Sequence, residues 1–167
     1  MASTHEPIQL QVAGRLFALL RAGVNDHLAD CAQDPLPASA FAPIKPGPLS
    51  QDKIAVLYCG TMRPREINGR NAVTIATRDI LVKLEVYIWC VGASDVLAQA
   101  RAVACEYAVQ QIVELPANRN LGGLLEAPAA LGESEVPLAA AKGGQLFWHI
   151  TIPILCPVRV TRPEQER

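Results

Sequence analysis

Two stretches of the chain repeat apolar residues at the spacing of an α-helix. The first begins at Pro7, whose missing N–H costs nothing in the first turn of a helix. Its apolar positions are Ile8, Val12, Leu16, Leu19 and Leu20. We therefore predict a helix that starts at Pro7 and frays between residues 23 and 30.

The second helical stretch follows Ser94, which is a favourable N-cap, and Asp95, whose charge suits the positive end of a helix dipole. Pro116 ends this stretch, so the predicted helix runs to about Leu115. Its expected packing face holds Val96, Ala100, Val103, Ala104, Tyr107, Ala108 and Ile112. The many alanines indicate that the helix approaches a sheet closely.

Alternation of apolar and polar residues, typical of strands, occupies much of the remaining chain. Residues 53–60 and 79–91 predict two strands, and the Asn68-Gly69 dipeptide between them is a strong signal for a tight turn. Together these features predict a long β-hairpin. Residues 124–130 predict a short strand, and residues 145–160 predict a long closing strand.

Two prolines interrupt the closing strand. Pro153 and Pro157 are four residues apart, so their missing N–H groups point the same way. A strand that carries both can be paired on one side only near these residues, which predicts an edge or bulged strand.

The order of these elements predicts an α+β fold. A helix and an extended arm precede a hairpin, a second helix and a final pair of strands. We expect a mostly antiparallel sheet with a long β-hairpin and two main helices packed on one face. The length fits a single domain, residues 1–167, with a loose C-terminal tail at residues 161–167.

A proline-rich stretch at about residues 31–52 separates the first helix from the hairpin. Its prolines are Pro35, Pro37, Pro43, Pro46 and Pro48, which forbid a regular helix. A connection of this length without secondary structure is unusual within a compact domain. Phe41, Ile44 and Leu49 give the stretch apolar side chains, so we interpret it as an arm that lies on a neighbouring surface.

Composition excludes several classes of protein. Half of the residues are apolar, 19% are charged and the net charge is -1, which argues against disorder and against general attraction to nucleic acid or membranes. No apolar run approaches the roughly 20 residues of a membrane span. No signal peptide is evident at the N-terminus. Five scattered cysteines without a C-x-x-C pair argue against a zinc site or a disulfide framework. We expect their side chains to be buried and the protein to reside in a reducing cytoplasm.

The residues that could carry chemistry are dispersed. His149 and Cys156 have opposite parity on the closing strand, so a Cys–His pair is not expected. Glu126, Glu133 and Glu135 lie around a loop without a third converging ligand. No pair of adjacent glycines in the chain has the flanking sequence of a phosphate-binding loop. We therefore predict no catalytic, cofactor-binding or metal-binding residue, and no cofactor.

Arg63, Arg65 and Arg70 surround the Asn68-Gly69 turn. Three interpretations stay open for them: contact with phosphate, pairing with carboxylates of a neighbouring subunit, or simple solvation at a hairpin tip.

The arrangement resembles a known family. Its features are the N-terminal helix, the hairpin, the segment Asn118-Arg119-Asn120-Leu121-Gly122-Gly123-Leu124-Leu125-Glu126 after the second helix, and the closing strand Phe147-Trp148-His149-Ile150-Thr151-Ile152-Pro153-Ile154. Over about residues 8–160 the chain is similar to the tail-terminator (minor tail, tail-completion) proteins of long-tailed bacteriophages. The proline-rich stretch is longer than that family leads us to expect.

The resemblance implies a structural protein of the virion tail or neck, made in the cytoplasm of a host bacterium. Its subunits would form a homo-oligomer, a hexameric ring on the end of the tail tube. The ring would end tube polymerisation and offer a docking surface to the head–tail connector or neck protein. Genome DNA would pass through the ring without sequence-specific contact, and no membrane is involved.

Ring closure needs head-to-tail contacts between subunits. We expect the interface in the arm, the hairpin and the proline-marked strand, with Phe41, Ile44, Leu49, Arg63, Arg65, Arg70, Pro153 and Pro157 as its candidate residues. Three alternatives stay open: another neck or tail-completion subunit, a small module that binds a hydrophobic ligand, and an enzyme with a site around His149, Glu126 and Glu133.

Overall fold

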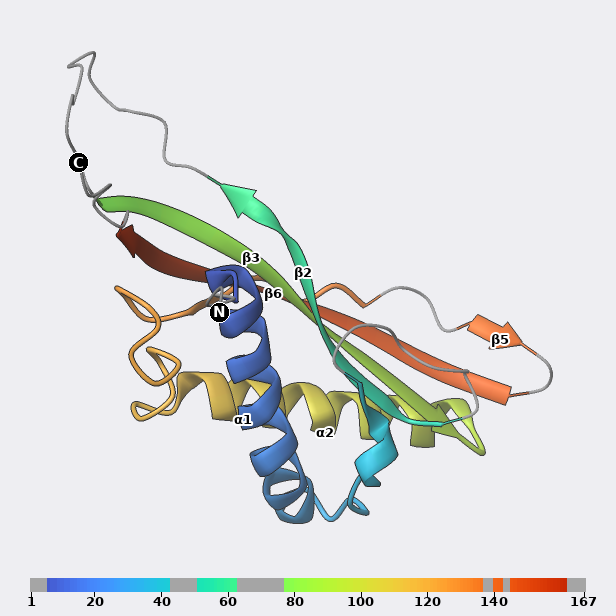
Figure 1. The fold of residues 1–167 in the computed structure, drawn as a ribbon. Coiled ribbons are helices and arrows are strands. Elements are labelled where there is room, and N and C mark those ends of the chain that lie inside the picture. The colour runs from blue at the N-terminus through green and yellow to red at the C-terminus, as the bar shows by residue number, and fades with distance from the viewer. Residues whose placement is uncertain (1–5, 43–50, 63–76, 137–139, 143–144, 162–167) are drawn as a thin grey trace, which may run out of the picture.

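The computed structural model describes residues 6–42, 51–62, 77–136, 140–142 and 145–161, and they form two layers (Figure 1). One layer is a sheet and the other consists of two helices, α1 (Ile8–Asp30) and α2 (Asp95–Glu114), which cross each other on the same face of the sheet. The fold is therefore α+β with both main helices on one face, as predicted.

Three long strands form the centre of the sheet, namely β2 (Lys53–Met62), β3 (Thr77–Gly92) and β6 (Gln145–Thr161). They are antiparallel neighbours in the order β2-β3-β6. The short strands are β1 (Phe41–Ala42), parallel to β2, and β4 (Ala130–Leu131) and β5 (Ala140–Lys142), both antiparallel to β6. The predicted β2–β3 hairpin pairing is confirmed, while its turn at Asn68-Gly69 lies outside the described residues.

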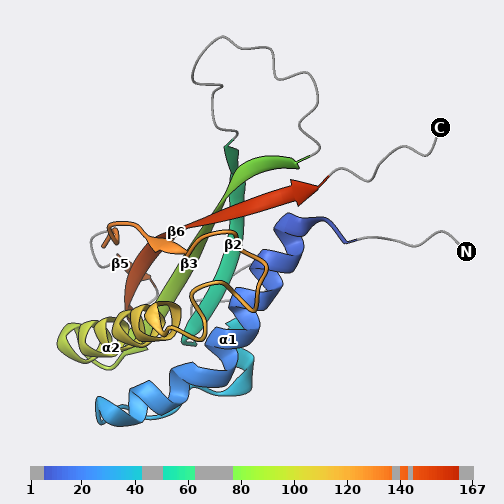
Figure 2. The same ribbon diagram turned by 90° about the vertical axis from the view of Figure 1, so that its left-hand side faces the viewer.

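The core lies between the sheet and the helices, because β3 and β6 bury every second side chain there. Leu84 pairs with Ile154, Val86 with Ile152 and Ile88 with Ile150. These six side chains are at most 1% exposed. The alternate residues of both strands point to the opposite face, which no described helix covers (Figure 2).

The first helix is regular beyond Gly23, where the sequence predicts that it begins to fray. It continues to Asp30 because Val24 and Leu28 are buried against the core. Gly23 has a packing role, since a Cβ there would lie 3.1 Å from Cδ1 of Ile112 in α2. The glycine thus allows the two helices to approach closely at their crossing.

The second helix begins and ends as predicted, but most of its predicted packing face is wrong. Ser94 caps it by accepting a hydrogen bond from the Leu97 N–H at 3.3 Å. Val96 and Val103 are 71% and 50% exposed, and Tyr107 is 43% exposed. The side chains that pack against the sheet and α1 are Ala98, Ala102, Ala104, Cys105, Ala108, Val109, Ile112 and Val113.

The strand predicted at residues 124–130 is wrong, since only Ala130–Leu131 forms strand β4. Residues 115–124 form turns, in which Leu121, Gly122 and Gly123 adopt positive φ angles of 46°, 72° and 89°. The turns bury Leu121 and Leu125 under the end of the core. Burial of Leu125 explains part of the apolar pattern that predicted a strand over residues 124–130.

The two prolines of β6 face its outer edge. β6 pairs with β3 along its whole length, and on its other side it meets only short segments. The Pro153 carbonyl accepts a hydrogen bond from the Gly132 N–H at 2.8 Å, and the Pro157 carbonyl accepts one from the Glu126 N–H at 3.0 Å. The edge-strand prediction is therefore wrong between the two prolines, where β6 pairs with β3 on one side and with the short strand β4 on the other.

Candidate interaction surfaces

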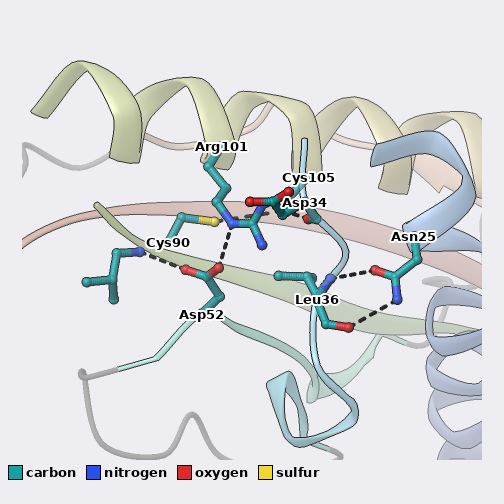
Figure 3. A network of polar contacts seen from close by, with 8 residues as sticks. Asn25, Asp34, Leu36, Asp52, Cys90, Arg101 and Cys105 are labelled. Atoms are coloured by element: carbon teal, nitrogen blue, oxygen red, sulfur yellow. Dashed lines mark hydrogen bonds and ion pairs between the residues drawn. The ribbon is translucent and has the colours of Figure 1, made fainter. Parts of the chain in front are cut away.

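One guanidinium group, that of Arg101, holds two points of the proline-rich stretch. Arg101 of α2 donates from Nε to the Asp52 carboxylate at 2.6 Å and from Nη1 to the Asp34 carbonyl at 2.7 Å (Figure 3). The other Asp52 oxygen accepts the Val91 N–H at 2.9 Å. Only 15% of each of the Arg101 and Asp52 side chains is exposed. Arg101 therefore holds residues 34 and 52 together.

The first part of this stretch lies on its own domain. The Asn25 side chain of α1 accepts the Leu36 N–H at 2.8 Å and donates to the Leu36 carbonyl at 3.1 Å (Figure 3). Leu36 and Ala40 are buried, and Phe41 packs partly buried against the core. Of the candidate interface residues in the arm, Phe41 thus contacts its own chain, while Ile44 and Leu49 lie outside the described residues.

The uncovered face of the sheet carries a ladder of stacked rings. The rings of Tyr87 and Trp89 in β3 both stack on that of His149 in β6, with centroids 5.1 and 4.9 Å away. Phe147 extends the ladder, since its ring centroid is 5.7 Å from that of Trp89. We call this surface the open face, and it consists of Leu57, Lys83, Glu85, Tyr87, Trp89, Phe147, His149 and Thr151.

His149 is the ring that both Tyr87 and Trp89 contact. Its burial lowers its pKa from the ordinary value and so favours the neutral form of the ring. Its Nε2 lies 3.2 Å from the Thr151 hydroxyl. Trp89 Nε1 is buried and has no hydrogen-bond partner among the described residues. Each ring uses a π face on its neighbour, so the open face presents mainly ring edges to solvent, which suit aliphatic side chains better than stacked bases.

A second uncovered apolar surface runs along α2 on the side away from the sheet. It consists of Val96, Ala100, Val103 and Tyr107, at the i, i+4, i+7, i+11 spacing of one helix face. All four residues are exposed, and Tyr107 also meets the His27 ring of α1 edge-on. We call this surface the outer stripe. α2 is therefore apolar on two opposite sides, of which only one is buried in the described part of the chain.

The other predicted interface residues are partly described. Pro153 and Pro157 are half-buried on the outer edge of β6, where Pro153 also packs against Gly132. Arg63, Arg65 and Arg70 lie outside the described residues, so the three interpretations of the hairpin tip remain predictions.

Residues considered for chemistry are kept apart by the fold. His149 lies on the open face, whereas Cys156 is fully buried in the core on the other side of the sheet. Glu126 forms an ion pair with Arg159 at 2.8 Å, and Glu133 is exposed. Within the described ranges, no three His, Cys, Asp or Glu side chains are placed to hold a metal ion.

The cysteines are partly as expected. Cys90, Cys105 and Cys156 are buried, but Cys31 is half-buried and Cys59 is exposed.

Among the described residues, neither α1 nor α2 has the length and apolar character that a membrane-crossing helix needs.

Sequence reasoning missed the clamp formed by Asp52, Arg101 and Asn25. An arginine within an alanine-rich helix and an aspartate directly before a strand were the available signals, but these two residues are 49 positions apart in the sequence.

Comparison with protein-family models and with curated proteins finds no match to this chain.

Proposed function

We propose that this chain is a structural subunit of a phage tail, which assembles with copies of itself into a ring that caps the tail tube. The ring would end tube polymerisation and dock the head–tail connector, while genome DNA passes through its centre. The protein would act through contacts alone, as a virion component without a catalytic site. This proposal extends the resemblance described above to a concrete role.

One observation supports the proposal most. A single small domain carries two apolar surfaces without a described partner, the open face of the sheet and the outer stripe of α2. Contiguous exposed apolar surface on a folded domain marks a site of contact with another molecule. Two different surfaces on one chain suit head-to-tail contacts, which close into rings when the rotation between subunits permits.

The order of the elements also supports the proposal. An N-terminal helix, a long antiparallel strand pair, a second helix and a closing strand follow one another as the resemblance implies. The segment from Asn118 to Glu126 folds into turns and buries Leu121 and Leu125, so it closes one end of the core. The remaining parts of the domain act as a rigid frame for the two surfaces.

The decisive measurement is the mass of the assembly as protein concentration rises. Native mass spectrometry and electron microscopy should find a ring whose mass is six times that of the 17.9 kDa chain. Added to polymerising tail-tube protein, the chain should produce tubes of fixed length that no longer elongate. A chain that stays monomeric at every concentration, and leaves tube growth unchanged, would contradict the proposal.

A matched variant makes the assay specific. Val103→Glu places a charge in the outer stripe, whereas Ala18→Glu places the same charge on an exposed position of α1. The first substitution should abolish ring formation and tube capping, and the second should leave both unchanged. Equal melting temperatures of the two variants would show that folding is not the cause of the difference.

A further inference from the structure

The two uncovered surfaces lie on opposite sides of the two-layer domain. α2 buries Ala98, Ala102 and Cys105 against the rest of the domain, and the outer stripe is on its far side. The open face is the sheet surface that neither helix covers (Figure 2). A sheet with apolar groups on both faces is most stable when helices cover both. This domain supplies helices for one face only.

The dimensions of the two surfaces match. The outer stripe runs from Val96 to Tyr107, about 17 Å at 1.5 Å per residue, on a helix about 10 Å across. The open face runs from Lys83 to Trp89 along β3, about 20 Å at 3.3 Å per residue. Its width is the distance from β2 across β3 to β6, about 10 Å for strands 4.8 Å apart. The open face is therefore long and wide enough for the outer stripe.

The chemistry of the two surfaces is complementary as well. The outer stripe offers aliphatic side chains, and the open face offers the ring edges of the ladder. The charges differ in sign: α2 carries Asp95, Glu106 and Glu114, and its single cation, Arg101, is held by Asp52. The open face holds Lys83 and Glu85, whose charges offset each other, and Lys53 beside it on β2 leaves one positive charge in excess.

We propose that the outer stripe of α2 in one copy packs on the open face of the next copy, so that α2 completes a helix–sheet–helix sandwich between subunits. This inference rests on the proposed function and names the contact that builds the ring. Each subunit gives one surface and receives the other, so the contact is head-to-tail. Trp89, whose buried Nε1 has no partner among the described residues, lies between His149 and Phe147 in the ladder beneath this contact.

The size of the contact explains how assembly depends on concentration. A footprint of roughly 20 by 10 Å is small beside the ~800 Å² that each partner buries in a standard stable complex. Two copies therefore associate weakly. A closed ring is favoured over a dimer because every subunit then uses both of its surfaces.

The test mixes two differently labelled chains. Both carry Cys31→Ser and Cys59→Ser, which remove the cysteines that are not fully buried. One chain adds Val103→Cys in the outer stripe, and the other adds Lys83→Cys on the open face. After mild oxidation with a disulfide shuffling reagent, the mixture should yield a cross-linked pair of the two chains. Ala18→Cys on α1 replaces Val103→Cys in the control mixture, which should yield none.

The remaining outcomes would overturn the inference. Cross-linking of the Val103→Cys chain with itself would mean that α2 packs on α2 in a symmetric dimer. Cross-linking of the Lys83→Cys chain with itself would mean that two sheets pack face to face. A ring of the expected mass without the mixed pair would refute this contact and leave the proposed function standing, whereas the absence of any assembly would refute both.

Discussion

The clamp around Arg101 provides the sharpest test of how the domain is held together. Arg101 donates to Asp52 at 2.6 Å, and both side chains are only 15% exposed. Exposed ion pairs contribute about 0–1 kcal/mol, whereas removing one partner of a buried pair costs roughly 3–5 kcal/mol. At 15% exposure the pair is closer to the buried limit. We therefore expect Arg101→Leu to lower the free energy of unfolding by about 2–4 kcal/mol.

The partner substitution separates charge from hydrogen bonding. Asp52→Asn keeps an oxygen that can accept the Val91 N–H, but it removes the charge that faces Arg101. The expected loss is smaller, about 1–3 kcal/mol, because Arg101 keeps its bond to the Asp34 carbonyl. The double variant should lose less than the sum of the two single losses, with a coupling of roughly 1–2 kcal/mol.

Urea unfolding of the four proteins measures these differences, provided that the m-value stays constant across the set. Arg21→Leu, on an exposed position of α1, is the matched control and should change stability by less than about 0.5 kcal/mol. If both single variants lose as little stability as the control and the coupling energy is near zero, then the Arg101–Asp52 pair does not stabilise the fold as expected. The pair would then behave as a solvated surface pair despite its burial.

Three further predictions concern single positions. Gly92→Ala should destabilise the protein by about 2 kcal/mol or more, because its Cβ would lie 2.6 Å from the Ala98 backbone nitrogen; Gly14→Ala, with nothing within 4 Å, should stabilise it by about 0.5–1 kcal/mol. Thermal melts of the two variants check the contrast in sign. NMR titration should give His149 a pKa below its ordinary 6.5, because burial disfavours the charged ring. The stability that its neutral form contributes is complete above pH 6.5 and is lost as pH falls from there through the lowered pKa, so His149→Gln should flatten that part of the pH profile. Cys59 should react slowly with iodoacetamide at pH 8 although it is exposed, because partial burial and the Glu85 carboxylate raise its pKa to about 11. Glu85→Gln should speed that reaction, and an unchanged rate would contradict the role of the carboxylate.

The three long strands of this fold were predictable because their signals are local. The alternation in β3 and β6 places one set of residues in the core. Ser94 marks the start of α2 for the same reason, since an N-cap acts within one turn. The clamp was not predictable, because the contact of Arg101 with Asp52 depends on how the two layers come together.

The turn segment after α2 shows a different limit of sequence reading. Residues 124–130 suggested a strand, yet only Ala130–Leu131 forms one. Positive φ angles at Leu121, Gly122 and Gly123 reverse the chain just before this segment, and Leu125 is buried directly after the reversal. The apolar side chains reach the core through turns, a route that periodicity does not distinguish from a short buried strand.

The error in α2 carries the most information about function. Its sequence is apolar on two opposite sides, so periodicity alone fits a helix buried on either side, and the prediction mixed residues from both. The small side chains Ala98, Ala102 and Ala108 allow α2 to lie close to its own sheet and to α1. Val96, Val103 and Tyr107 are larger and remain exposed. A chain that only had to fold would gain solubility from polar residues at these positions. Their apolar character therefore supports the contact that we propose, in which α2 covers a surface of a second copy.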